Sequence, residues 1–232
     1  MSTINSISEY LEIINNLDDD FIFRGQTSDW ELVPKIGRNS VNELGYEDWE
    51  TLEDDLLDKF IREVSLLLDK EPERKIDWLI LGQHYGLPTR LLDWTSNPLK
   101  ALFFACTDRF DDNGILYLLS PNGFNEDSLD GKFNFYEKGF NVFYPKLNNE
   151  RIALQEGCFI IYPLPKNTSE LVEINKQNFP NDIDDMKKLT VPSIYKRKLL
   201  KELNVLGINH KTMFSGVEGI CRKICYEMDY PC

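Results

Sequence analysis

The sequence predicts an α+β fold in a single domain over residues 1–232, with mostly helices around a small, strongly bent β-sheet core. Two observations support this prediction. Apolar residues recur at helical spacing in several stretches, and short continuous apolar runs typical of buried strands lie between them. No internal repeat and no low-complexity linker divides the chain, so the core is expected to extend over about residues 5–225.

Helices are expected to dominate the first half of the chain, with short strands between them. Apolar residues on a 3.6-residue period make residues 49–68 the clearest helix, which ends before Pro72. The same spacing predicts a helix at residues 6–17, and a further helix is expected at residues 76–83. Residues 21–24, between the helices expected at residues 6–17 and 49–68, read as a short strand.

From residue 86 onward, turn-forming residues divide the chain into shorter elements. Gly and Pro are expected to break residues 86–98 into turns, and residues 120–144 read as a loop. Strands are expected at residues 115–119, 158–162 and 171–174. Helices are expected at residues 98–108, 183–188, 193–203 and 217–226. Ser96 or Asn97 is the expected N-cap of the first of these helices.

The chain is strongly acidic. It has 26 Lys and Arg against 39 Asp and Glu, which gives a formal net charge of −13. Phosphate backbones and anionic membranes repel such a chain unless its basic residues cluster, and its basic runs lie in helical stretches typical of a solvated face. Nucleic acid and membrane are therefore not expected partners. A small ligand or a basic protein partner fits the charge better.

The cysteines and histidines form no metal-binding pattern. The five cysteines lie at scattered spacing, and the two histidines, His84 and His210, are far apart in sequence, so no metal is expected. The N-terminus has no secretory signal, and the longest apolar runs are far shorter than the ~20 residues of a membrane span. These features predict a cytoplasmic protein.

The first candidate site is Phe23-Arg24-Gly25-Gln26. An Arg between an apolar strand and a Gly places a guanidinium at a strand end, where the backbone leaves room for a ligand. Arg suits phosphate or carboxylate because its donors are planar and bidentate. The alternative is an Arg that pairs with a nearby acid as part of the fold.

The second candidate site, residues 82–98, places polar and aromatic side chains between turn-forming residues, a composition typical of functional loops. These side chains are His84, Tyr85, Arg90, Asp93, Trp94, Thr95 and Ser96. A structural interpretation stays open, in which Arg90 pairs with Asp93 and Ser96 caps a helix.

A third candidate segment, residues 151–157, opens a strand and contains Gln155 and Glu156. A carboxylate at a strand entrance can act as an acid, a base or a stabiliser of positive charge, although such a Glu is more often only solvated. Residues 213–220 read as a turn and a helix start, and we interpret them as structural.

Residues 23–25 and 83–95 together resemble the FRG domain, a family named for a Phe-Arg-Gly signature. Its second hallmark, Gln-His-Tyr-Gly-Leu-Pro-Thr-Arg-Leu-Leu-Asp-Trp-Thr, is matched by residues 83–95 without departure. The family occurs largely in bacteria and phages. The resemblance therefore implies a bacterial or phage-infected cell, and a role in phage conflict as a defence protein or a toxin.

The same residues are similar to the motifs of arginine-specific ADP-ribosyltransferases. Those enzymes carry an aromatic-Arg-Gly strand, then a Ser-Thr-Ser strand leading into a helix, and last a strand bearing a Glu. Residues 23–25, 95–96 and 155–156 occupy these positions in the same order. The resemblance implies an ADP-ribosyltransferase-like sheet core and NAD as the substrate.

The resemblance also implies roles for individual residues. Arg24 would anchor a phosphate or ribose of NAD, and Glu156 would stabilise an oxocarbenium-like transition state, with Gln155 beside it as the residue that the FRG pattern emphasises. The residues implied in binding NAD are Arg24, Gly25, Gln26, Gln83, His84, Tyr85, Arg90, Asp93, Thr95 and Ser96. Adjacent residues on a strand point to opposite faces, so only one of Gln155 and Glu156 can face the site. If that residue is Gln155, the chain is expected to bind NAD without transferring it.

Three functions follow from these observations. The leading hypothesis is an NAD-using ADP-ribosyltransferase or NAD glycohydrolase-like protein, with a protein acceptor in the case of transfer. The alternative is a non-catalytic module that senses a nucleotide or a protein partner through the same pocket. A third hypothesis is an interaction domain whose negative surface meets a basic protein.

Overall fold

The computed structural model describes residues 2–17, 20–123, 139–145, 150–228 and 230. Its strands are β1 (Ser2–Thr3), β2 (Ile22–Gln26), β3 (Leu91–Thr95), β4 (Gly114–Pro121), β5 (Asn141–Phe143), β6 (Gly157–Ile161) and β7 (Ile183–Val191). Its α-helices are α1 (Ile7–Ile14), α2 (Trp49–Val64), α3 (Lys75–His84), α4 (Pro98–Cys106), α5 (Glu150–Gln155), α6 (Ser193–Val205), α7 (His210–Met213) and α8 (Gly216–Glu227).

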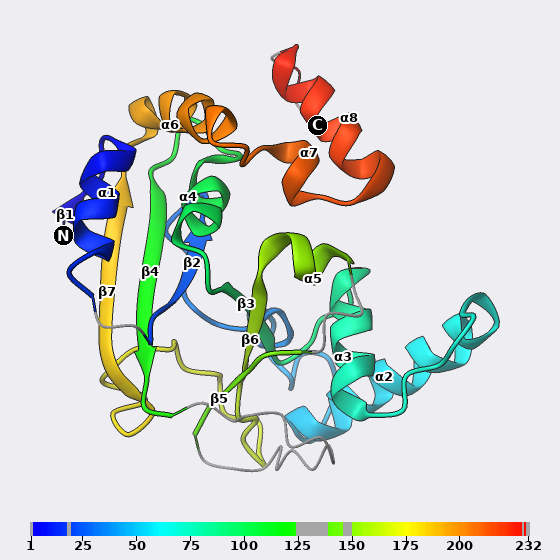
Figure 1. Cartoon of the computed structure of the whole chain (residues 1–232). Coiled ribbons are helices and arrows are strands. Elements are labelled where there is room, and N and C mark those ends of the chain that lie inside the picture. The colour runs from blue at the N-terminus through cyan, green and yellow to red at the C-terminus, as the bar shows by residue number, and fades with distance from the viewer. Residues whose placement is uncertain (1, 18–19, 124–138, 146–149, 229, 231–232) are drawn as a thin grey trace.

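The strands form one mixed sheet that curls into a half-barrel (Figure 1). Their order is β1-β7-β4-β2-β3-β6-β5, and every pairing is antiparallel except that of β1 with β7. The predicted α+β class is confirmed. The sheet is larger than expected, because it has seven strands among the described residues.

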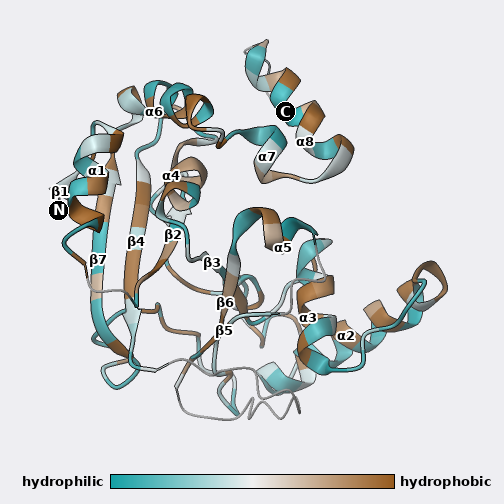
Figure 2. Cartoon of the chain, viewed as in Figure 1, coloured by the Kyte–Doolittle hydropathy of each residue, from teal (hydrophilic) through white to brown (hydrophobic). Residues whose placement is uncertain are grey.

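Both faces of the interior strand β4 are buried, which explains its continuous apolar sequence (Figure 2). Ile115, Tyr117 and Leu119 join an apolar cluster on one face of the sheet. Leu116 and Leu118 point the other way and pack in a second cluster with α1, α4 and α6. A third cluster joins α2 and α3 to the β3–β6–β5 end of the sheet. The sheet is thus covered on both faces and at one end.

Helix α4 begins as the sequence predicts. Asn97 is its N-cap, and the side-chain oxygen of Asn97 accepts hydrogen bonds from the backbone N–H groups of Leu99 and Lys100. Pro98 occupies the first turn, where no backbone donor is needed. The helices expected at residues 6–17, 49–68, 76–83, 193–203 and 217–226 are also confirmed, as α1, α2, α3, α6 and α8.

The helix expected at residues 183–188 is wrong, because this segment is part of strand β7. Strand β4 is buried and needs a hydrogen-bonding partner on each edge. β2 supplies one edge, and β7 supplies the other over eight register positions. This long-range pairing overrides the local pattern of the segment.

Three smaller expectations also differ from the structure. The turns expected at residues 86–98 contain strand β3, whose five residues all pair with β6. The loop expected at residues 120–144 contains β5, and its residues 124–138 lie outside the described residues. Residues 171–174 are not a strand, although the N–H of Ile174 donates to the carbonyl oxygen of Leu32 over 3.1 Å. In the described ranges, no helix combines the length and the apolar character that crossing a membrane requires.

Candidate functional site

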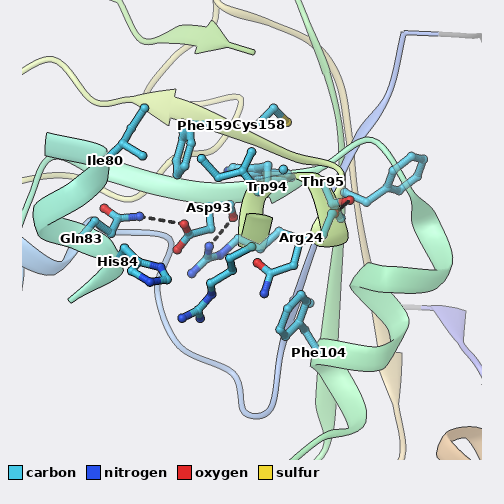
Figure 3. Close-up of a pocket in the computed structure, with 16 residues that line it drawn as sticks. Arg24, Ile80, Gln83, His84, Asp93, Trp94, Thr95, Phe104, Cys158 and Phe159 are labelled. Atoms are coloured by element: carbon cyan, nitrogen blue, oxygen red, sulfur yellow. Dashed lines mark hydrogen bonds between the residues drawn. The ribbon is translucent and has the colours of Figure 1, made fainter. Parts of the chain in front are cut away.

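The sheet opens between β2 and β3. These strands share one register position, Phe23 opposite Thr95, whereas each pairs over five positions with its other neighbour. Past this position the strands separate without pairing. A cavity of about 250 Å³ lies at the opening, lined by Arg24 from β2 and by Asp93 and Trp94 from β3 (Figure 3).

Gly25 brings helix α4 against the opening. A Cβ atom at Gly25 would lie 1.9 Å from the carbonyl oxygen of Ala101 and 2.6 Å from the backbone nitrogen of Ala105. Only a residue without a side chain permits this approach of helix backbone to strand. The contact places Phe104, on the next turn of α4, in the wall of the cavity.

Arg24 presents a half-buried guanidinium to the cavity. Its Nη1 donates to the carbonyl oxygen of Asp93, and its Nε donates to Oε1 of Gln26 over 3.2 Å. No carboxylate of the described residues lies within 4.0 Å of it, so it has no ion pair there. Burial lowers the pKa of Arg24, the charge of Asp93 opposes this shift, and Arg38 adds to it. An arginine stays protonated despite such a shift, so the cavity holds a cation that an anionic ligand would neutralise.

Gln83 and Thr89 hold the Asp93 carboxylate in place. The hydroxyl of Thr89 donates to Oε1 of Gln83, and Nε2 of Gln83 donates to Oδ1 of Asp93 over 2.8 Å. The backbone N–H of Leu91 donates to the same Thr89 hydroxyl over 3.2 Å. The matched motif therefore builds a chain of hydrogen bonds from the loop after α3 into strand β3.

Arg90 has a structural position. Its side chain is 1% exposed and forms a forked ion pair with Glu53 on α2, with N–O distances of 2.6–2.9 Å. Lys75 lies 3.3 Å from the same carboxylate. The interpretation that paired Arg90 with Asp93 is wrong, because Glu53 is the partner of Arg90. The pair fixes the start of β3 against α2 and does not line the cavity.

The other residues predicted from this segment are divided between the cavity and its surroundings. His84 and Thr95 line the cavity. Burial lowers the pKa of His84, and the charge of Arg151 lowers it further, which favours a neutral imidazole. Tyr85 is 70% exposed and does not line the cavity, while the hydroxyl of Ser96 contacts only the carbonyl oxygen of Glu156 in the described residues.

The structure separates Gln155 from Glu156. Gln155 is the last residue of α5 and lines the cavity, where its Nε2 also donates to the carbonyl oxygen of Met213 over 3.0 Å. Glu156 adopts a left-handed backbone conformation with a φ of 48° and does not line the cavity. Its carboxylate lies 2.7 Å from Nζ of Lys100 and accepts from Nδ2 of Asn97 over 3.3 Å. Neither residue is on a strand, since β6 begins at Gly157.

A second hollow, a groove of about 880 Å³, adjoins this cavity. The two hollows share four lining residues: Arg24, Gly25, Phe104 and Arg151. Gln26, a predicted site residue, is buried in the wall of the groove. We refer to the two hollows as the inner cavity and the outer groove.

The outer groove adds arginines that the sequence prediction missed. Arg38 and Arg222 line it together with Arg24 and Arg151. The Phe214 ring contacts two of them, with the Arg222 guanidinium 4.3 Å and the Arg151 guanidinium 5.5 Å from the ring centre. Four arginines thus meet in one groove of an acidic chain, although Glu31, Asp108 and Glu170 line it as well. Arg38 and Arg222 carry no local sequence signal, because the fold alone brings them together.

No group of three or more His, Cys, Asp or Glu residues in the described ranges is arranged to hold a metal ion. The inner cavity brings together a half-buried arginine, a positioned carboxylate, an imidazole and aromatic walls.

A comparison with protein families identifies an FRG domain at residues 19–114. This segment runs from β2 to the start of β4 and includes Arg24, Gln83 and Asp93, whereas Arg151, Gln155 and Arg222 lie outside it. No curated protein and no solved structure significantly matches the chain.

Proposed function

Because the chain contains an FRG domain that supplies Arg24, Gln83 and Asp93 to one cavity, we propose that it binds NAD and cleaves the bond between nicotinamide and ribose. The ADP-ribosyl group then passes to water or to an acceptor. In this proposal the nicotinamide end occupies the inner cavity, and the phosphates lie at Arg24 and along the outer groove.

The observation that carries the proposal is the position of Arg24. Its guanidinium is half-buried at the junction of the two hollows and has no ion pair among the described residues. Arginine binds phosphate through paired, charge-assisted hydrogen bonds. A phosphate placed at this junction extends a ligand into both hollows, as a dinucleotide requires.

The walls of the hollows fit the two ends of such a ligand. Trp94, Phe104 and Phe159 line the inner cavity, which suits a flat aromatic ring. The outer groove is within the usual volume range of small-molecule sites and carries three further arginines. Both features agree with a ligand that has an apolar ring at one end and negative charge along its middle.

The alternative is a non-catalytic sensor that binds a nucleotide through the same hollows. One observation favours it: the Glu156 carboxylate is paired with Lys100 and does not line the inner cavity. In that case the ligand stabilises the fold and is not consumed. The role in phage conflict, the cytoplasmic location and a basic protein partner stay predictions.

The experiment measures free nicotinamide and the melting temperature with millimolar NAD, in the presence and absence of cellular protein. A ligand at ~100 times its dissociation constant stabilises a fold by about 2.7 kcal/mol, which raises the melting temperature of a chain of this length by about 5–10 °C. We expect Arg24→Gln to lose both the release and the shift. The matched control is Arg62→Gln, which replaces an exposed arginine on α2 that lines neither hollow, and it should keep both.

Three outcomes are informative. Nicotinamide release that depends on Arg24 supports the proposal. A melting shift without release supports the sensor. If wild-type protein shows neither a shift nor release, NAD is not its ligand and the proposal is wrong.

A further inference from the structure

We propose that Asp93, and not Glu156, is the carboxylate that acts on the substrate ribose, and that Gln83 and Thr89 are its positioning residues. This inference rests on the proposed function, since it assigns the catalytic group of that same reaction.

Asp93 is the acidic residue that the fold delivers to the inner cavity. Of the Asp and Glu residues in the described ranges, it is the one that lines this cavity. It projects from the middle of β3, where its neighbours Leu92 and Trp94 are buried, and it is accessible because β2 and β3 separate at this level. A substrate in the opening therefore meets this carboxylate directly (Figure 3).

The hydrogen-bond chain fixes one face of the carboxylate and leaves the other open. Oε1 of Gln83 accepts from the Thr89 hydroxyl, so the amide nitrogen of Gln83 must face Asp93. The bond from Gln83 ends at Oδ1 of Asp93, and Oδ2 has no hydrogen-bond partner among the described residues. The open Oδ2 of this oriented carboxylate is placed to stabilise a cation at the ribose and to accept a proton from the group that attacks it.

The charge of Asp93 is also available. Arg24 contacts the backbone carbonyl of Asp93, and no cation of the described residues lies within 4.0 Å of its carboxylate. The Glu156 carboxylate, by contrast, is paired with Nζ of Lys100 at 2.7 Å. An ion pair partly neutralises a carboxylate, so Glu156 is the poorer stabiliser of a developing positive charge.

The reaction assigned to Asp93 has two steps. The bond between C1′ of the ribose and the nicotinamide nitrogen breaks, and its electron pair leaves with nicotinamide, which becomes neutral. The ribose is left as an oxocarbenium-like cation beside the Asp93 carboxylate. A water molecule, or the nucleophilic group of an acceptor, then forms the new bond to C1′ and gives its proton to Oδ2 of Asp93, which releases it to solvent.

The test compares nicotinamide release and ADP-ribose binding in matched carboxylate variants. Asp93→Asn keeps the shape and is expected to lower kcat at least 100-fold, with the Kd for ADP-ribose within about threefold of wild type. Glu156→Gln is expected to keep kcat within about twofold. Asp185→Asn, which alters an exposed carboxylate of β7 paired with Lys187, is the control for loss of a negative charge.

The positioning role has its own readout. Thr89→Val removes the hydroxyl that orients Gln83, whereas Thr89→Ser keeps it. Gln83→Leu removes the donor that orients the Asp93 carboxylate, so kcat is expected to fall about 10-fold or more while the Kd for ADP-ribose stays within about threefold of wild type. Thr89→Val should lower kcat in the same way, and Thr89→Ser should restore it. A purely structural role would lower stability without this selective loss of kcat.

The outcomes separate this inference from the proposed function. Wild-type turnover with a full kcat in Asp93→Asn overturns the role of Asp93, as does a larger loss in Glu156→Gln than in Asp93→Asn. Binding of ADP-ribose without any wild-type turnover also overturns it, while nucleotide binding stands. If wild-type protein binds neither NAD nor ADP-ribose, the proposed function itself fails.

Discussion

Phe23 and Thr95 form the single register pair between β2 and β3, and the candidate site lies where these strands separate. Each residue belongs to a motif recognised in the sequence, Phe23 to the Phe-Arg-Gly signature and Thr95 to the end of the longer hallmark. Their pairing explains why two motifs about 70 residues apart contribute to one cavity.

The packing of α4 on β2 gives the first prediction. Gly25→Ala would place a Cβ atom 1.9 Å from the carbonyl oxygen of Ala101, so α4 must shift away from the strand. We expect a loss of about 1–3 kcal/mol in the free energy of unfolding, measured by urea denaturation. Gly157→Ala is the matched control, because its nearest Cβ contact is an ordinary 3.4 Å, and it should cost less than about 1 kcal/mol. Equal losses in both variants would contradict this account of Gly25.

The buried ion pair of Glu53 with Arg90 gives the second prediction. Both side chains are 1% exposed, so Glu53→Gln leaves an arginine charge in the interior without its carboxylate. Breaking such a pair typically costs about 3–5 kcal/mol, whereas apolar residues in place of both partners are often neutral. We therefore expect Glu53→Gln to be much less stable than wild type, and Glu53→Met combined with Arg90→Met to recover most of the loss. Asp54→Asn, at the exposed neighbour that contacts Lys75, should change the stability little.

Lys196 gives the third prediction. Although it is a lysine, it is fully buried, and its Nζ donates to the carbonyl oxygens of Thr27, Asp108 and Arg109 over 2.8–3.0 Å. Lys196→Met leaves these three acceptors without their charged donor, and we expect a loss of about 3 kcal/mol in urea denaturation. Lys198→Met, two residues along on α6 and exposed, should stay within ~0.5 kcal/mol of wild type. A stable Lys196→Met protein would show that the three bonds are dispensable.

The fourth prediction concerns pH. Burial lowers the pKa of His210 below its usual 6.5, and Arg222 lowers it further against the opposing charge of Asp108. His210 is therefore protonated more readily in the unfolded state than in the folded state. As a result, the free energy of unfolding falls as the pH is lowered from about 6.5. His84 is shifted in the same direction.

The measurement is urea denaturation at pH 7.5 and pH 5.5, a range above the titration of ordinary carboxyl groups. We expect wild-type protein to be less stable at pH 5.5, and His210→Gln to lose a smaller part of its own stability over the same interval. A pH dependence that is unchanged in His210→Gln would contradict the assigned cause.

Local patterns predicted the helices well and the sheet less well. Helix α2 follows from apolar residues that recur on one helical period, and α4 from a cap, a proline and an apolar run. Strand β7 was mistaken for a helix because its assignment depends on pairing with β4, which lies about 70 residues earlier in the sequence. Pairings of this range leave no periodic signal in the segment itself.

The site was predicted only in part, and long-range contacts are again the reason. Arg24, Gln83 and Asp93 stand in two motifs, and the fold brings them together. The partner of Arg90 is Glu53, 37 residues away on helix α2, so the structural role of Arg90 was not visible in its own motif. Arg38 and Arg222 come from opposite ends of the chain, and only the tertiary structure places them along one groove.

The most direct test of the account is a calorimetric titration of NAD into wild-type protein, Arg24→Gln and Arg62→Gln at low and moderate salt. Hydrogen bonds to a charged group contribute about 1.5–3 kcal/mol, so we expect Arg24→Gln to weaken the binding about 10- to 100-fold. Added salt should weaken wild-type binding, because it screens the attraction between the arginines of the site and the phosphates of NAD. Arg62→Gln should bind as wild type does. Equal dissociation constants in all three proteins would show that Arg24 does not hold the ligand and would contradict the central claim.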